Sequence, residues 1–445
     1  MDSNLNSVIY IIAGFFVVFL ILAKPYFGLI ITIASQPIID LLPRIPVLSS
    51  VMPLIGALTV ASFLLNYKNL NLRSAFHISF SHIFSLLFIL WIFITNPTAA
   101  WLGVDRNWLL TYVQLWVLFW LSGVLFDKPG KFHTMMWVFS SLTLVTALSA
   151  MSRQGFFGEI DPLVRAAGFT DGANTAARYF VISFVFFSYL RPVTGNLLLN
   201  ALAALGMIIT FLGVFYTASR TGMILLLLAI TLLMLLQSNF KYRMQVSVLA
   251  MVGFLILLIF SSSIFTFMSG IAPSITEGSD TMGLRYALWE AGWEMWKDNP
   301  ISGVGIGMFP STLKYYPNPE YSFLFYKGLV AHNIYVSMLA ETGIFGFFLF
   351  MLFLLSNLVN FVRSIDRLDA SFRPIAYAFF IVVIVMLAGG MTKTDQVDKV
   401  LWLSMGTSVF FSNQIKTSIS KTKKKPEDSA ETVEQSLAQI KPYGR

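Results

Sequence analysis

Arginine is the residue type whose placement most clearly indicates chemistry in this chain. Seven arginines lie between apolar stretches or just inside their ends, at positions that share one face of a membrane if the stretches cross it in turn. They are Arg44, Arg106, Arg153, Arg165, Arg178, Arg220 and Arg285. A guanidinium group is a planar fork that donates paired hydrogen bonds to phosphate oxygens. Each arginine could instead pair with a carboxylate or reach the lipid headgroups, but the full set on one face favours a phosphate or pyrophosphate ligand.

His332 adds a group that can move a proton. It ends a long polar stretch and begins a new apolar run. At helical spacing, Tyr335, Leu339, Gly343 and Gly346 share its face, which is small at its inner end and suits close helix packing. A lone histidine is often structural. On an arginine-rich face, a neutral imidazole would serve as a general base and a charged one would bind phosphate.

Two short polar segments come before helices on the same face. In the first, we expect Asp171 or Asn174 to cap the helix that follows, whose N-terminus favours anions, with Arg165 as an anion ligand beside it. In the second, Arg220 lies in a tight turn between two spanning helices. Arg178 lies just inside a helix, where a charge is costly unless it is paired or lines a wet cavity. Helix capping and interfacial contacts are the structural alternatives.

The long polar stretch 263–332 contains two distinct parts. Residues 283–297 have the pattern of an amphipathic helix, with Arg285 and three tryptophans at spacings of three and four residues. We expect this helix to lie in the plane of the membrane interface. The glycines at 303, 305 and 307 lack the preceding strand and the following Lys-Ser/Thr of a nucleotide-binding loop. They are expected to allow a tight path of the backbone under the loop.

The elements that carry these residues are membrane helices. The chain has 445 residues, of which 56% are hydrophobic and 12% charged, with a mean hydropathy of +0.74. Soluble domains have about 25% charged residues. With no cysteine and only four histidines, no metal cluster of thiolates or histidines is expected. Candidate spans of sufficient apolar length are 8–23, 26–42, 51–66, 76–95, 108–126, 132–150, 175–190, 197–216, 222–237, 244–262, 333–362, 375–390 and 400–412.

Lysine and arginine in the short loops set the orientation. Loops on the side of the C-terminal tail are basic, so that side is predicted to be the cytoplasm and the stretch 263–332 to be outside. The predicted fold class is an all-α polytopic membrane protein with about 12–13 transmembrane helices. We divide the chain into N-terminal helices 1–150, a membrane domain 151–415 and a disordered cytoplasmic tail 416–445.

At His332 the chain fits a specific family pattern. His332-Asn333 is followed after nine residues by Gly343-Ile-Phe-Gly346, as in the His-[Asn/Ser/Gln]-x9-Gly-x-x-[Gly/Thr/Tyr] pattern of O-antigen ligases. The chain therefore resembles the superfamily of O-antigen ligases and O-antigen polymerases, a group of bacterial membrane glycosyltransferases.

Other segments carry the same resemblance, which spans Arg165 to about Gly346. Arg285, with the tryptophan and the glycines that follow it, resembles the large outer loop of the family. The turn around Arg220 and the segment that begins at Arg165 resemble two further family motifs. One departure is that the ligases have leucine four residues after the turn arginine, whereas this chain has Ile224.

The resemblance implies a class-C glycosyltransferase-like fold in the bacterial inner membrane, with its active site facing the periplasm. It implies that an acceptor hydroxyl displaces undecaprenyl pyrophosphate from a glycan, with no metal, nucleotide or other cofactor. The implied catalytic residues are His332, Arg220 and Arg285. The implied substrate-binding residues are Arg165, Asn174, Arg178 and Asn333.

Several acceptors are compatible with this chemistry. The favoured reaction is ligation to lipid A–core in lipopolysaccharide biosynthesis, and the alternative is polymerisation of O-antigen or exopolysaccharide repeat units. The partners are then the lipid-linked donor, the acceptor and membrane lipid, without nucleic acid. A protein O-oligosaccharyltransferase is less favoured. An anion transporter is also less favoured, because it would need arginines or broken helices at mid-membrane.

Overall fold

The structure, a computed structural model, describes residues 14–42, 51–69, 78–96, 107–153, 167–191, 195–236 and 281–416, together with residues 244, 247, 248 and 251. Every regular element in these segments is helical and none is a strand, which confirms the all-α prediction. Several predicted features lie outside the described residues. They are Arg44, Arg106, Arg165, nearly all of the span 244–262 and nearly all of the tail 416–445.

Helices occupy the expected spans within the described residues, with two exceptions. The N-terminal elements are a helix at residues 14–23, α2 (Tyr26–Ala34), η1 (Gln36–Leu41), α3 (Met52–Leu65), η2 (Tyr67–Asn69), α4 (Phe80–Thr95), α6 (Asn107–Leu125) and α7 (Pro129–Arg153). The central elements are α8 (Ala173–Leu190), α9 (Leu197–Tyr216) and α10 (Arg220–Leu236). The last are α13 (Thr281–Asp298), α14 (Phe309–Thr312), η5 (Leu313–Tyr315), α15 (Ser322–Tyr326), α16 (Ile334–Ser364), η6 (Ile365–Arg367), α17 (Arg373–Gly389) and a helix at residues 399–416.

The first exception is the expected span 26–42, which is wrong. Helix α2 ends at Ala34 and is followed by the short 3-10 helix η1, in which Ile38 has non-helical backbone angles. Pro37 explains the break, because proline lacks a backbone N–H and disfavours helical geometry in the residue before it. The nine residues of α2 reach only about 14 Å, roughly half the thickness of the hydrocarbon core.

The second exception is α16, which is broken at Gly343 (φ 63°, ψ −173°). The continuous face expected to start at His332 is therefore interrupted. The run 303–307 packs into the break, where the N–H groups of Val304 and Gly305 donate to α16 carbonyls at 2.9 Å each. A Cβ atom on Gly343 would lie 2.2 Å from the carbonyl oxygen of Ile301, so only glycine fits. The expectation that the glycine run allows a tight backbone path is confirmed.

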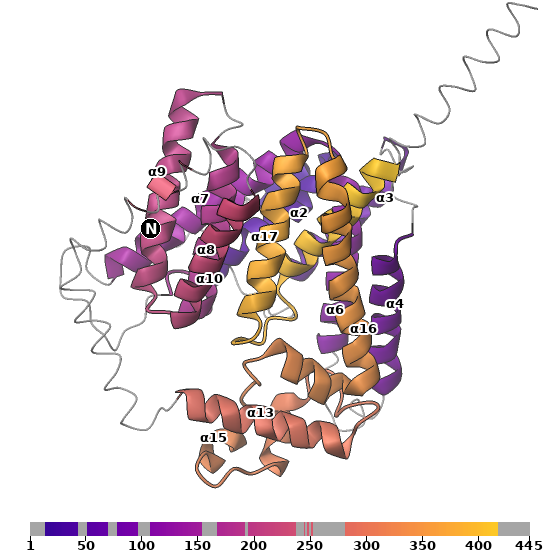
Figure 1. Cartoon of the computed structure of the whole chain (residues 1–445). Helices are drawn as coiled ribbons and strands as arrows, with labels where there is room; N and C mark the ends of the chain where they lie inside the picture. The colour runs from indigo at the N-terminus through magenta and orange to yellow at the C-terminus, as the bar shows by residue number, and fades with distance from the viewer. Residues whose placement is uncertain are drawn as a thin grey trace, which may run out of the picture.

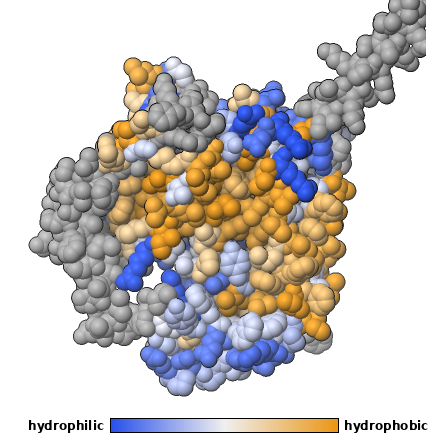
Figure 2. Space-filling model, in the orientation of Figure 1, coloured by the Kyte–Doolittle hydropathy of each residue, from blue (hydrophilic) through white to orange (hydrophobic). Residues whose placement is uncertain are grey.

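The outer surface of the helices is apolar. Among the described residues, four helices are long and apolar enough to cross a membrane, namely Trp108–Leu125, Pro129–Ser152, Leu197–Tyr216 and Ile334–Arg367. Figure 2 shows a hydrophobic band across the molecule, with hydrophilic residues gathered at its two ends. Side chains such as Leu65 and Leu227 are 75% and 67% exposed, which lipid favours and water does not. The chain is thus a multi-pass membrane protein.

Helix α8 forms the centre of the bundle. All of its residues except Asn174 are buried. It packs against α7, α9, α10 and α17, and Figure 1 shows it among these helices, with α13 and α15 gathered at one end of the molecule. We call this end the α13 end. Polar groups near the start of α8 are consequently placed within the protein, where they need partners.

Candidate active site

His332 lies immediately before α16 in a strained backbone conformation. Its φ of 51° falls in the left-handed region, which residues other than glycine rarely adopt. Asn333 caps the helix by accepting hydrogen bonds from its first two free N–H groups at 2.9 and 3.3 Å. The N–H of Ile334 donates to the carbonyl of Gly390 at 2.8 Å. His332 is therefore held in a turn rather than in the helix, at a strain of about 1–3 kcal/mol of the kind found at functional sites.

Helix α13 places an arginine near this histidine. The predicted helix 283–297 is confirmed, and its buried face is formed by Ala287, Leu288, Ala291 and Met295. The indole N–H of Trp289 donates to the carbonyl of Ala331 at 3.0 Å. Arg285, one turn earlier, is partly buried and has no hydrogen bond or ion pair with any described residue.

Burial and nearby cations favour the neutral form of the His332 imidazole. Burial is the largest cause that lowers the pKa of His332 below its usual value of 6.5, and the cations Arg285 and Lys393 lower it further. Asp395 acts in the opposite direction and is outweighed. A neutral imidazole accepts a proton at neutral pH, so the surroundings favour the general-base role over the phosphate-binding one.

The segment 390–398, between α17 and the last helix, supplies the cation Lys393. Its ammonium group lies 3.4 Å from the carboxylate of Asp171 and 3.3 Å from that of Asp395, and it also contacts the hydroxyl of Thr175. Because Lys393 also acts on the pKa of His332, this segment connects the start of α16 to the start of α8. Lys393 is consequently a member of the site that the sequence motifs did not identify.

Arg178 is enclosed by carboxylates. It is 2% exposed, forms an ion pair with Asp395, and lies 4.0 Å from Asp398. The hydroxyl of Tyr179 donates to Asp398 at 3.0 Å. A buried charge needs such partners, so the first of the two conditions expected for Arg178, pairing, is met. Its guanidinium holds the segment 390–398 against α8, whereas a substrate contact for Arg178 stays a prediction.

The start of α8 is joined to the turn that carries Arg220. The hydroxyl of Ser219 donates to the side-chain oxygen of Asn174 at 2.8 Å and accepts from the N–H of Gly222 at 3.0 Å. The N-cap of α8 is Gly172, with no side-chain cap, so the expected capping by Asp171 or Asn174 is wrong. The carboxylate of Asp171 instead lies 3.4 Å from the ammonium group of Lys393. The side-chain oxygen of Asn174 accepts the hydrogen bond from Ser219.

Arg220 is the first residue of α10, is exposed, and has no hydrogen bond or ion pair with any described residue. The turn before it is strained, with Ala218 at φ 48°. Arg220 and Arg285 are thus the two predicted arginines in the described residues that have no protein partner. Arg178 is paired with Asp395. The structure does not describe the side chains of Arg44, Arg106, Arg153 and Arg165.

Glu341, in α16, holds the glycine run in place beside the site. Its buried carboxylate accepts hydrogen bonds from the N–H groups of Gly307 and Phe309 at 2.9 and 3.2 Å, and thereby fixes the glycine run to the first turns of α16. Sequence reasoning missed Glu341, Lys393, Asp395 and Asp398. The available signal for Glu341 was a carboxylate inside an apolar run, which is costly without partners. For the other three, no local pattern reveals a partner in α8.

One comparison with known proteins identifies the central part of the chain. Residues 205–351 match the model of a family described as O-antigen ligase. The match extends from α9 past Gly346 and includes Arg220, Arg285 and His332, so the resemblance to the O-antigen ligase and polymerase superfamily is confirmed. No curated protein matches the chain. The protein is a multi-pass membrane protein with an O-antigen ligase family domain, and this indicates a glycosyltransferase-like enzyme that acts on lipid-linked glycans.

Proposed function

We propose that the protein transfers a saccharide from undecaprenyl pyrophosphate to an acceptor hydroxyl, at the periplasmic face of a bacterial inner membrane. The observation that carries the proposal is a partly buried histidine beside the cations Arg285 and Lys393, which favour its neutral form. Burial, together with Arg285 and Lys393, favours the basic form of His332, and the guanidinium groups of Arg285 and Arg220 have no hydrogen bond or ion pair among the described residues. A transfer reaction that releases pyrophosphate needs both kinds of group.

The proposed step assigns one role to each group. His332 takes the proton of the acceptor hydroxyl as its oxygen attacks the anomeric carbon of the donor. The bond between this carbon and the pyrophosphate oxygen breaks, and the electron pair leaves with the lipid pyrophosphate. Arg220 and Arg285 donate hydrogen bonds to the developing charge, which stabilises the transition state. We propose that Asn174, Arg165 and the amide group of Asn333 contact the saccharide or its phosphates, while Arg178 positions the segment 390–398.

Ligation to lipid A–core is the favoured reaction, because the His332 motif fits the ligase pattern. Polymerisation of lipid-linked repeat units is the second candidate, since the family match includes both activities in general. A deletion strain analysed by a glycan gel separates them. Free lipid-linked polymer together with bare core would indicate a ligase, whereas single repeats on core would indicate a polymerase. Unchanged glycans on both carriers would contradict the proposed function.

The proposed orientation places the α13 end in the periplasm. Because the chain contains no cysteine, single cysteines can report it without background. Lys314 is exposed at the α13 end, and Arg367 is exposed at the end of α16. A membrane-impermeant maleimide should label Lys314→Cys in intact spheroplasts, and Arg367→Cys only after lysis. The reverse result would place the site in the cytoplasm and contradict the assignment.

The proposed reaction uses arginines in place of a metal ion for the charge of the leaving group. Purified protein should then retain transfer activity in EDTA. Activity that is lost in EDTA and restored by Mg²⁺ or Mn²⁺ would show that a cation, rather than Arg220 and Arg285 alone, stabilises the pyrophosphate.

A further inference from the structure

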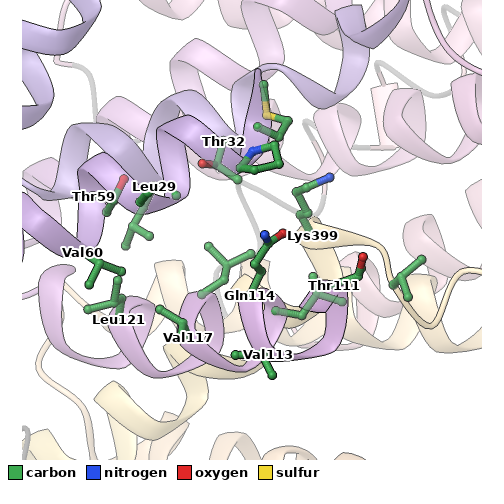
Figure 3. Close-up of a pocket in the computed structure, with 17 residues that line it drawn as sticks. Leu29, Thr32, Thr59, Val60, Thr111, Val113, Gln114, Val117, Leu121 and Lys399 are labelled. Atoms are coloured by element: carbon green, nitrogen blue, oxygen red, sulfur yellow. The ribbon is translucent and has the colours of Figure 1, made fainter. Parts of the chain in front are cut away.

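A groove lies between α2, α3 and α6, apart from the site around His332. Its volume is about 230 Å³, and its walls are formed mainly by aliphatic side chains of the three helices. Val397 and Lys399 also line the groove, and Lys399 lies towards one end of it (Figure 3). Figure 3 shows Gln114 and Lys399 near this end, and Leu29, Val60 and Leu121 towards the other.

Some polar side chains of the groove are already hydrogen-bonded within their own helices, whereas others could bind a ligand. The hydroxyls of Thr32 and Thr59 donate to carbonyls within their own helices, at 2.8 and 2.6 Å. The ammonium group of Lys399, which interacts with the carboxylate of Asp398 through charge alone, and the amide group of Gln114 have no hydrogen bond or ion pair with any described residue. The groove therefore presents one cation and one amide at one end and a largely apolar wall beyond them. This distribution is complementary to a molecule with an anionic head and a hydrocarbon chain.

The position of the groove fits one leaflet of a bilayer. Its polar end is near the α13 end of the protein, because Trp108, at the start of α6, lies against Gly307 of the glycine run. The stretch of α6 from Thr111 to Leu121 is about 15 Å long. This is half of the roughly 30 Å hydrocarbon core and thus the depth of a single leaflet.

We propose that the groove binds one acyl chain of an anionic phospholipid from the leaflet at the α13 end, with the phosphate at Lys399 and Gln114. The depth of one leaflet matches an acyl chain, whereas a polyprenyl chain of many isoprene units would extend well beyond the groove. The volume is below the roughly 300–1,000 Å³ of pockets for larger ligands, so the groove has room for at most one chain, part of which would remain in contact with the bilayer.

Binding there would act on the segment 390–398. Lys399 directly follows Asp398, which together with Asp395 surrounds Arg178. A phosphate on Lys399 would hold the end of this segment, while the Arg178 pair holds its middle. Lipid binding is therefore expected to stabilise the protein, whatever reaction it catalyses.

The test compares purified protein in nanodiscs of phosphatidylcholine alone with nanodiscs that also contain phosphatidylglycerol. Phosphatidylglycerol should raise the Tm of the wild-type protein, and native mass spectrometry should detect retained phosphatidylglycerol. Lys399→Gln should reduce this retention about fivefold, the equivalent of about 1 kcal/mol for one cation near a membrane surface.

A second variant fills the groove without removing the charge. Gly56 lines it and has no atom within 4 Å of an added Cβ, so Gly56→Leu occupies the chain site without a backbone clash. It should also lose the phosphatidylglycerol effect. Gly130→Leu is the matched control, since the Cβ site of Gly130 is equally open and lies outside the groove. Retention by both test variants equal to wild type, or selective retention of a polyprenyl phosphate, would overturn the proposal.

Discussion

The indole N–H of Trp289 donates to the carbonyl oxygen of Ala331 at 3.0 Å, and this bond fixes α13 to the residue directly before His332. Arg285 precedes Trp289 by one helical turn, so the same bond determines where its guanidinium lies relative to the imidazole. The histidine and the arginine belong to different elements, 47 positions apart by their residue numbers. One side-chain contact therefore places the proposed base and the proposed anion ligand together.

Lysine should not replace arginine at positions 220 and 285. Lysine keeps the charge but donates from a single point, whereas arginine binds phosphate as a planar fork. Charge-assisted hydrogen bonds contribute about 1.5–3 kcal/mol each, so Arg220→Lys and Arg285→Lys should reduce turnover roughly ten- to a hundredfold. Glycan transfer in membranes, normalised to protein level, measures this. Arg363→Lys, exposed at the far end of α16, is the control and should be nearly silent. Full activity of both test variants would make these arginines interfacial anchors.

Replacement of His332 should separate stability from activity. Glycine adopts the φ of 51° without strain, and asparagine tolerates it better than most residues. His332→Gly and His332→Asn should therefore fold at least as well as wild type while transfer is abolished. Tm and transfer activity, measured on the same purified samples, test both parts. Substantial transfer by either variant would exclude His332 as the general base.

The pH dependence of transfer should reflect the lowered pKa of His332. A general base must be neutral, so kcat/KM should fall as the pH drops through the lowered pKa, with the midpoint of this acid limb below pH 6.5. Lys393→Gln removes one of the cations that lower this pKa, so its acid limb should move to higher pH. An acid limb in the wild-type protein above pH 6.5, or one that Lys393→Gln moves to lower pH, would contradict the assigned role.

The pair of Arg178 and Asp395 should be important for stability. Asp395→Ala leaves a buried guanidinium with only Asp398, 4.0 Å away, and breaking a buried pair costs about 3–5 kcal/mol. The Tm should fall markedly, and the double variant Arg178→Met/Asp395→Ala should recover part of the loss because the charge is gone. Asp369→Ala, at an exposed position, is the control. Equal Tm values for Asp395→Ala and wild type would show that the pair is dispensable.

The helical architecture could be predicted from the sequence because apolar length directly encodes a membrane helix. The breaks were harder to predict. Pro37 was a visible signal, but the apolar run continued through it. Gly343 also lies within an apolar run, and its backbone angles depend on the run 303–307, which packs into α16 from outside. A helical wheel assumes an uninterrupted helix and cannot detect such a contact.

The site residues also divide into those that the sequence reveals and those that only the fold reveals. Local motifs contain His332, Arg220 and Arg285, and such motifs can be recognised in a single sequence. The partners of Lys393 and Asp395 are Asp171, Thr175 and Arg178, more than two hundred positions earlier. No spacing rule connects two segments so far apart, and the segment 390–398 shows only a mixture of charges in the sequence. The arginines proposed to bind a ligand and the arginine that pairs with Asp395 therefore looked alike before the fold was known.

The separation of 217 positions between Arg178 and Asp395 has a consequence for biogenesis. The ribosome releases α8 long before the carboxylate that neutralises its guanidinium has been synthesised. Until then, α8 carries an uncompensated charge that is costly in the lipid interior. The helix would have to remain beside water or the insertion machinery until α17 and the segment after it arrive. Premature termination between residues 178 and 395 would consequently expose this charge, giving proteases a means to distinguish such unfinished chains from complete ones.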